Sequence, residues 1–379
     1  MSETTLATAS ERQVWVTSYF QEYVRQSRFM PYMTNSDLNK GGIILTKFQR
    51  EEEAFRTINI PFIGRLKAAG VTGAQVLDGS EETLTNYNCP VTIDWRRNGV
   101  RLPKSTTFRT EINLWDAAKD ALRVWESEKL RDDIIHALAH CVTDVNGTIV
   151  PWDQATAAQQ NTWVANNSDR VLFGSLNSNY SATLATALSN VASSATASAA
   201  NMSLAKRIAK LADPHIRPFR ATEGDGREFY VAFHGSRTFR DLKNDTTIIN
   251  ANTQARSRES PGMKDNPLFQ DGDLLYDGVI HREIPEIDTY CGGISNPNGG
   301  AVFNGAGASA CDIRPVFLCG GGAVGIAWGQ EPTPRTDMIK DYGFRPGVAI
   351  EELLGVKKIN FNGVQNGIVT CFMAATADS

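Results

Sequence analysis

The feature that most constrains the fold is a long stretch without proline or glycine, LWDAAKDALRVWESEKLRDDIIHALAHC, at residues 114–141. Asn113 can cap the first turn of a helix here, and Asp116 stands in that turn. At a rise of ~1.5 Å per residue, such a helix is roughly 42 Å long, which exceeds a typical globular helix. We therefore expect a strut-like helix that continues to Cys141. Its buried face can be formed by Leu114, Ala118, Ala121, Leu122, Trp125, Leu130, Ile134, Leu138 and Cys141.

Before this helix, short runs rich in strand-forming residues predict strands at 43–48, 55–63 and 91–95. In the last run, apolar Val91, Ile93 and Trp95 alternate with polar residues, which is typical of a half-buried strand. A glycine-rich polar segment, GRLKAAGVTGAQVLDGSEETLTNYN, separates the second run from the third. We expect a long hairpin with an elaborate tip. Because a two-stranded ribbon is marginally stable alone, it should rest on the parent domain or on a neighbouring subunit.

A glycine cluster in VFLCGGGAVGIAWG raises the question of a cofactor. Gly320, Gly322 and Gly325 match the G-x-G-x-x-G spacing of a dinucleotide-binding turn. Such a site needs a following helix whose N-terminal amides bind the pyrophosphate. Here only AVGIAW precedes Gly329 and two prolines, which is too short for a crossover helix. We expect a strand that runs into a helix of one or two turns, and we keep a nucleotide-dependent oxidoreductase only as an alternative function.

The composition narrows the classes of protein to which this chain can belong. With 379 residues, of which 41% are hydrophobic, the chain can bury at least one large core, and we expect two or more compact regions. The 38 basic and 42 acidic residues give a net charge of −4, so no overall field attracts nucleic acid or an anionic membrane. No stretch reaches the ~20 apolar residues of a membrane span, and the start does not resemble a signal peptide. We expect a protein made and kept in the cytosol.

The titratable residues show no pattern of a reactive centre. The six cysteines include no C-x-x-C pair, so we expect reduced, mostly buried thiols. His136 and His140 have the spacing of a zinc-binding pair but lack the glutamate of H-E-x-x-H. We interpret them as residues of the last helical turn that complement the helix dipole. We expect no catalytic residue, no cofactor-binding residue and no metal site.

The rest of the chain reads as a mixture of helices and strands. A capping-box pattern at Ser10 predicts an amphipathic helix that ends before Pro31. The Ala- and Ser-rich stretch 177–213 predicts a mobile loop or weak helix, followed by a better helix at 203–211. REFYVAFHG and GVIHREIPEI predict strands. The end of the chain predicts a hairpin that turns at Asn362 and Gly363.

This order of elements resembles the major capsid proteins of tailed bacteriophages with the Hong Kong 97-like fold. Several phrases look like the podophage branch of these proteins: GVTGAQVLDGSEETL, VTIDWRRNGV, LWDAAKDALRVWESEKLRDDIIHALA, NPLFQDGDLLYDGVIHREI and DYGFRPGVAIEELLGVKKINFNGVQNGIV. The resemblance extends from about Trp15 to Ala374. It rests on the number and order of the phrases, since none of them is a catalytic signature.

The resemblance implies an α+β fold with named regions. These are an N-terminal arm at 1–40, an extended β-hairpin loop at 41–111, a peripheral domain with a spine helix at 112–150, an axial domain at 151–314, and C-terminal strands shared between the two domains at 315–379. In such shells the extended loop lies over an adjacent subunit, which would solve the stability problem of the hairpin.

The resemblance also implies a function, which is self-assembly as pentamers and hexamers into an icosahedral shell around double-stranded DNA. The partners would be further copies of the chain, a portal protein, scaffolding and decoration proteins, and packaged DNA bound without sequence specificity, with no membrane involved. The protein would be in the virion, and in the host cytoplasm during assembly. A non-viral shell protein of the same fold is a further alternative.

Mixed charges in the extended loop suit salt bridges between subunits, although a solvated face explains each of them equally well. The candidate contact residues are Arg50, Glu51, Glu52, Glu53, Asp78, Glu81, Glu82, Arg96 and Arg97.

Overall fold

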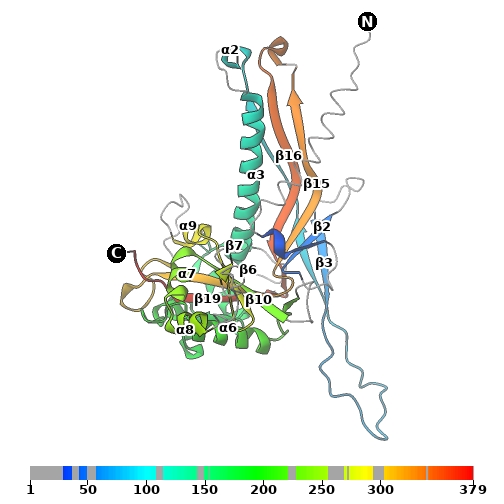
Figure 1. The fold of residues 1–379 in the computed structure, drawn as a ribbon. Helices are drawn as coiled ribbons and strands as arrows, with labels where there is room; N and C mark the ends of the chain where they lie inside the picture. The colour runs from blue at the N-terminus through cyan, green and yellow to red at the C-terminus, as the bar shows by residue number, and fades with distance from the viewer. Residues whose placement is uncertain are drawn as a thin grey trace.

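The structure, a computed structural model, describes residues 29–35, 42–48, 57–107, 114–142, 149–152, 154–220, 228–254, 269–270, 273–292, 303–338 and 340–378. A tall arm of one long helix and several strands rises from a rounded body, and a hairpin projects in the opposite direction (Figure 1). Helices and sheets both contribute, so the predicted α+β class is confirmed. The helix predicted between Ser10 and Pro31 lies largely outside the described residues.

The tall arm, which is not the N-terminal arm expected at 1–40, is built on a five-stranded sheet in the order β1-β2-β15-β16-β5. Its strands are β1 (Met33–Asn35), β2 (Ile44–Phe48), β15 (Val324–Asp337), β16 (Gly347–Lys358) and β5 (Asp94–Arg101). The long strands β15 and β16 pair antiparallel, and β5 pairs antiparallel with the outer edge of β16. Strand β2 joins the other side of β15 in parallel.

Helix α3 (Leu114–Leu138) lies along this sheet, mainly against β16. Ala118 and Leu122 pack on Val348 and Ile350 in a small apolar cluster. The helix is three residues shorter than predicted, because His140–Val142 form strand β6, which pairs with β7 (Ile149–Pro151). No proline or glycine marks this end, so the sequence alone did not reveal it. A short helix, α2 (Lys104–Thr107), lies at the far end of the arm (Figure 1).

The predicted hairpin is present. Strands β3 (Thr57–Ile63) and β4 (Asn86–Thr92) pair antiparallel, and residues 64–85 form the tip. The third predicted strand run is not continuous, because the chain passes at Ile93 from β4 into β5 of the arm sheet. The alternation breaks at this point. Val91 and Ile93 are buried, but Trp95 is 53% exposed, so the prediction that Trp95 shares their buried face is wrong.

The body surrounds a second sheet in the order β11-β12-β13-β10-β14-β19-β8, with β9 attached to β10. Two of its strands confirm the predictions at REFYVAFHG and GVIHREIPEI. In chain order the strands are β8 (Val171–Phe173), β9 (Phe219–Arg220), β10 (Glu228–His234), β11 (Phe269–Gln270), β12 (Asp273–Tyr276), β13 (Val279–Glu283), β14 (Ile313–Cys319) and β19 (Ile368–Ala374).

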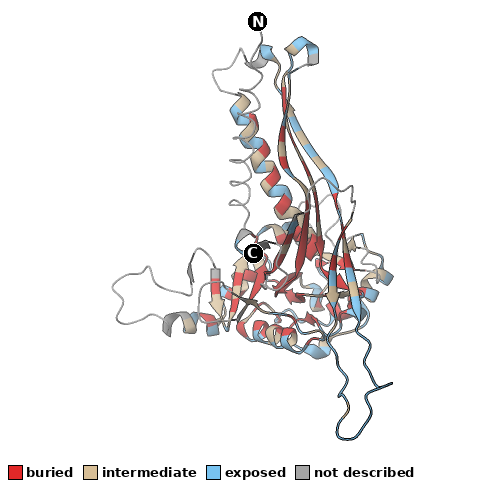
Figure 2. Ribbon diagram, turned by 90° about the vertical axis from the view of Figure 1, so that its right-hand side faces the viewer, coloured by how far each residue is buried: buried red, intermediate tan, exposed pale blue. Residues whose placement is uncertain are grey.

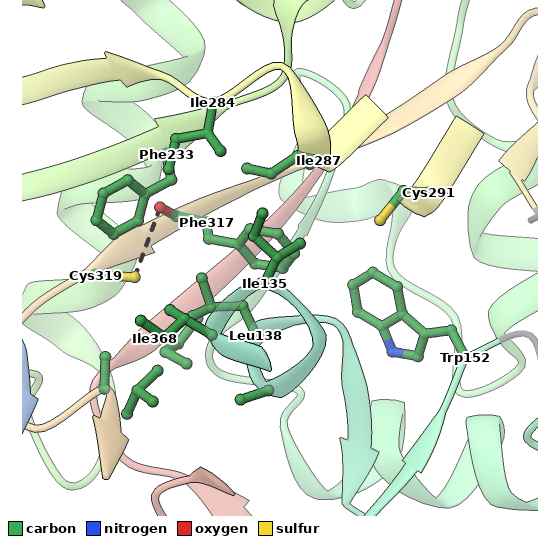
Figure 3. Close-up of a cluster of buried hydrophobic side chains, with 14 of the residues drawn as sticks. Ile135, Leu138, Trp152, Phe233, Ile284, Ile287, Cys291, Phe317, Cys319 and Ile368 are labelled. Carbon is green, nitrogen blue, oxygen red and sulfur yellow. Dashed lines mark hydrogen bonds between the residues drawn. The ribbon is translucent and has the colours of Figure 1, made fainter. Parts of the chain in front are cut away.

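Both faces of this sheet are buried. Along β10, Val231 and Phe233 belong to one apolar cluster, whereas Tyr230 and Ala232 belong to another. In the first cluster, side chains from the end of α3 meet residues of the sheet, as Figure 3 shows for Ile135, Leu138 and Phe317. The lower end of the arm and the body therefore share one core.

Helices pack on the body sheet. The small residues Ala205 and Ala209 are fully buried, which lets α6 approach β19 closely. The helix predicted at 203–211 is confirmed, because it lies within α6, which begins at Ala199. In the stretch before it, which was predicted as a mobile loop or weak helix, residues 184–189 form α5. The helices are α4 (Ala157–Asn166), α5 (Leu184–Ser189), α6 (Ala199–Leu211), α7 (Ser236–Lys243), α8 (Thr246–Gln254) and α9 (Glu286–Gly292).

The C-terminal turn agrees with its prediction. Strands β17 (Asn360–Phe361) and β18 (Val364–Gln365) form a short hairpin. The chain reverses direction at Asn362 and Gly363, whose φ angles are 53° and 78°. Asparagine and glycine adopt such positive φ angles more readily than other residues. Short 3₁₀ turns η1 (Met30–Tyr32), η3 (Asn177–Asn179), η6 (Ala308–Ala310) and η7 (Lys340–Gly343) complete the described elements.

Candidate functional site: the projecting hairpin and the end of the arm

The tip of the β3–β4 hairpin exposes apolar side chains to solvent. Ile63, Leu66, Val76, Leu77 and Leu84 are each between 56% and 73% exposed. Figure 2 shows the tip as an almost continuously exposed loop that extends away from the body. Groups of exposed apolar side chains mark surfaces that bind other molecules. The tip is therefore the first candidate contact surface.

Glu82 links the two sides of the tip through hydrogen bonds. Its carboxylate accepts hydrogen bonds from the backbone N–H of Lys67 at 2.7 Å and of Ala68 at 2.6 Å. These bonds hold the pKa of Glu82 below its usual value. Glu81 accepts a bond from the N–H of Gly79 at 2.8 Å, and Asp78 is exposed beside it. The structure thus brings the three predicted acids together at the tip and gives Glu82 a role in shaping it.

The root of the hairpin is tied to the body. Lys67 Nζ lies 2.5 Å from Asp213 Oδ2, and Arg65 reaches the other carboxylate oxygen of Asp213 at 3.4 Å. Phe62 stacks on Phe361 with ring centroids 4.5 Å apart. A cavity of about 220 Å³ lies between these groups. Sequence reasoning did not select Arg65 and Lys67, although their spacing of two residues places them on one side of an extended chain.

Arg96 acts inside the subunit. It donates hydrogen bonds to Glu352 of β16 and to Asp133 of α3, and its side chain is 18% exposed. Arg97 is exposed and lies opposite Glu351 in the β5–β16 register. Of this pair, Arg97 is the one available to a neighbouring molecule. The other predicted contact residues, Arg50, Glu51, Glu52 and Glu53, lie outside the described residues.

A second exposed apolar surface lies at the end of the β15–β16 hairpin. Met338, Tyr342 and Phe344 are 56%, 106% and 46% exposed. Asp341 and Tyr342 both have positive φ angles, of 55° and 48°, which are costly for residues other than glycine. Tyr342 thus combines an unusual backbone conformation with a side chain that is fully outside the fold. Sequence reasoning did not select these three residues, because an exposed aromatic cannot be told from a buried one by its spacing.

The glycine cluster does not form a nucleotide cradle. Strand β14 runs into a tight turn at residues 320–323 and then directly into β15, so the predicted helix of one or two turns is wrong. All four amides of the turn donate to carbonyl groups of the chain: Gly320 to Gly367, Gly321 to Arg217, Gly322 to Gly42 and Ala323 to Ile43. With their N–H groups used in this way, these amides cannot bind a pyrophosphate.

The histidine pair differs from its prediction. His136 lies in α3 and packs edge-on against Tyr290, but His140 lies in β6. Burial lowers the pKa of His140 to about 3, so its ring is neutral and does not complement the helix dipole. Among the described residues, no group of three or more His, Cys, Asp and Glu side chains could hold a metal ion. The six cysteines are free thiols, and all but Cys311 are buried, as predicted.

No helix in the described part of the chain is both long enough and apolar enough to span a membrane.

Comparison with known proteins gives one consistent result. The family described as phage capsid protein matches residues 3–373. The major capsid protein of Pseudomonas phage KPP25 is 24% identical, over 97% of this chain and 96% of that protein. The solved capsid asymmetric unit of cyanophage Pam1 is 46% identical over the whole of both chains, with a TM-score of 0.81. The capsid of Ralstonia phage GP4 shares the fold, with a TM-score of 0.66 and 20% identity over 93% of this chain and 92% of that one.

Proposed function

The chain belongs to the phage capsid protein family and is a major capsid protein that forms a phage shell, and we propose that its copies assemble as pentamers and hexamers into an icosahedral capsid around double-stranded DNA. The symmetry of such rings lets one contact surface be used repeatedly. Each contact can be weak, because many contacts per subunit act together. Weak contacts also let misplaced subunits leave before the shell closes.

The observation that carries this proposal is the hairpin. Residues 64–85 project from the subunit with five large apolar side chains exposed at or beside the tip. Fully burying an apolar side chain of this size contributes ~1.5–3 kcal/mol. A neighbouring copy that receives the tip would therefore gain several such contributions. Asp78, Glu81 and Arg97 are the predicted contact residues that the structure leaves accessible to that neighbour.

The regional roles follow the same proposal. Residues 1–40 would be the N-terminal arm, 41–111 the extended loop, 112–150 the peripheral domain with α3 as its spine helix, 151–314 the axial domain, and 315–379 the strands shared between the two domains. The division between a peripheral and an axial domain is supported by the two separate sheets, the five-stranded sheet beside α3 and the eight-stranded sheet of the body. It is supported further by β14 and β15, which follow each other in the chain but belong to different sheets.

The proposal extends to partners and location. A portal protein, scaffolding and decoration proteins would bind the shell, and assembly would take place in the host cytoplasm. The net charge of −4 suits a wall that encloses DNA without binding its sequence. The protein would have no catalytic role, which is consistent with the occupied amides of the Gly320–Ala323 turn.

Electron microscopy of the expressed protein, alone and with a scaffold, tests the proposal. Shells, tubes or capsomers are expected for the wild type. Leu77→Asp, which places a charge on the tip, should leave the subunit folded and reduce the yield of particles at least tenfold. Leu176→Asp is the matched control, because Leu176 is 57% exposed on the body. A stable monomer at high concentration would contradict assembly, and saturable nicotinamide cofactor binding in a fluorescence titration would favour the oxidoreductase.

A further inference from the structure

Helix α6 turns a basic face to solvent. On its buried side, Ala205 and Ala209 pack on the body sheet. Arg207 and Lys210 are exposed on the opposite side, three residues apart and therefore on one face of the helix. Within the described part of the chain, neither of these two cations forms an ion pair. Their charge is therefore available to another molecule.

Further cations continue this face to the root of the hairpin. Lys206 of α6 lies 3.0 Å from Asp277. Asp213, two residues after the end of α6, contacts two cations of the hairpin at once, Arg65 and Lys67. Each of these two acids is matched by at least one cation of its own. We call the five cations the basic strip: Arg65, Lys67, Lys206, Arg207 and Lys210.

Other acids near the strip leave its centre on α6 positive. Asp169 pairs with Arg170 at 3.0 Å, and Glu82 lies on the hairpin, where backbone N–H groups hold its carboxylate. Asp245 binds the first turn of α6, which is ~12 Å from Arg207 along the helix axis. Charges that far apart at a surface are largely screened, since the Debye length is about 8 Å at physiological ionic strength. The strip is thus a local positive surface on a chain whose net charge is −4.

The spacing of these cations suits a phosphate backbone. Phosphates of one strand of double-stranded DNA are about 3.4 Å apart along the duplex axis. Arg207 and Lys210 are ~4.5 Å apart along the axis of α6, and their side chains are long, so each can reach a different phosphate. Contacts to phosphates hold a duplex without reading its sequence.

A protein partner fits the strip less well. The core of an interface between proteins is apolar and depleted of charged residues. The large apolar side chains that the described residues expose gather mainly at the hairpin tip and at the end of the arm, and α6 contributes one of them, Leu211. The charge of the strip and its few apolar side chains therefore favour a polyanion.

We propose that the basic strip binds the phosphate backbone of the enclosed double-stranded DNA, without sequence preference. This inference rests on the proposed function, in which the shell encloses DNA, and adds the surface of the subunit that contacts it. That surface lies at the end of the body away from the arm, where Figure 1 shows α6. A strip of five cations binds weakly in one copy, but the strips of many copies act together on one DNA molecule.

Binding of a short fluorescein-labelled DNA duplex to the full chain, measured by anisotropy at several salt concentrations, tests the proposal. The affinity of the wild type should fall as salt rises. In the double variant Arg207→Gln/Lys210→Gln, the slope of log affinity against log salt should become shallower by about two, about one for each lost phosphate contact. The decrease should be the same for duplexes of different sequence.

The matched control is Lys129→Gln/Arg335→Gln, which removes the same charge from exposed positions on α3 and β15. It should keep the slope of the wild type. An unchanged slope in the α6 double variant, or an equal decrease in the control, would overturn the proposal.

Particle assembly, followed by electron microscopy, separates this inference from the proposed function. The α6 double variant should form particles at the yield of the wild type, because the strip does not join the copies to one another. A loss of particles in this variant or in Leu211→Asp would assign the surface to a protein contact and overturn the inference. A wild type that forms particles but does not bind the duplex would also overturn it, while the proposed assembly would stand.

Discussion

Lys67 Nζ of the hairpin and Asp213 Oδ2 of the body lie 2.5 Å apart, although 146 residues separate them in the sequence. Arg65 contacts the same carboxylate, and these cations hold the pKa of Asp213 below its usual value. Lys67 also contacts the other side of the hairpin, because its backbone N–H donates a hydrogen bond to the Glu82 carboxylate. One short segment thus shapes the tip and also ties its root to the body.

Asp213→Asn should release the root of the hairpin while leaving the fold intact. Both partners of the ion pair are about half exposed, so the loss of global stability should stay below about 1 kcal/mol. Limited proteolysis within residues 64–85 should become faster, and particle yield should fall. Asp277→Asn removes a comparable surface pair with Lys206 in the body and serves as the control. Equal cleavage rates in all three proteins would contradict the proposed tie.

Lys358 is a buried cation that should respond to alkaline pH. Its ammonium donates to the carbonyl of His140 at 3.0 Å and lies near the rings of Trp152 and Trp163, and burial lowers its pKa to about 8. Because the unfolded chain keeps the proton up to about pH 10.5, this group makes the fold more stable as pH rises from about 8 to 10.5. Chemical denaturation should show this gain in the wild type and not in Lys358→Met. The same slope in both proteins would exclude Lys358 as its source.

His234 and His281 should make the body sensitive to acid. Nε2 of His234 lies 2.9 Å from Nδ1 of His281, and both rings are fully buried. Burial lowers both pKa values, that of His281 to about 3. Unfolded histidines bind protons below about pH 6.5, so stability should fall between pH 6.5 and 3, by up to ~1.4 kcal/mol per pH unit for each ring.

Denaturation of the wild type and of His281→Gln across this pH range checks the histidine prediction. In the variant, the free energy of unfolding should depend less steeply on pH, because one fewer proton is bound on unfolding. An unchanged slope would exclude His281 as a source of the acid sensitivity.

Gly320→Ala should damage the turn between the two sheets. A Cβ atom at this position would lie 2.3 Å from the carbonyl oxygen of Arg217, so backbone must move. Overpacking of this kind typically costs ~1–3 kcal/mol. Gly347→Ala is the matched control, since its nearest neighbours would lie at an ordinary 3.4 Å. Thermal unfolding compares the two variants, and equal midpoints would contradict the close packing of the turn.

Local signals in the sequence were enough to predict the hairpin and the turn at Asn362 and Gly363, because alternation and turn residues act over a few positions. The end of α3 was missed, since the pairing of Cys141 with Val150 competes with the helix and leaves no local signal. Trp95 was misplaced because one apolar alternation crosses two sheets. In the glycine cluster, spacing alone did not reveal that the amides donate to carbonyls of distant residues.

The candidate surfaces were predictable in part. The acids of the tip could be placed because the hairpin could be placed. The tie between Lys67 and Asp213 and the burial of Arg96 beside Glu352 join residues far apart in the chain, and no pattern in one sequence reports such pairs. The full exposure of Tyr342 likewise has no signal in the sequence.

The most direct test of the central claim is an electron cryo-microscopy map of the assembled particle. We predict a closed icosahedral shell of pentamers and hexamers in which residues 64–85 of each copy lie on an adjacent copy, with Val76 and Leu77 buried between them. A shell in which every hairpin tip contacts only its own subunit, with these side chains still in solvent, would contradict the claim.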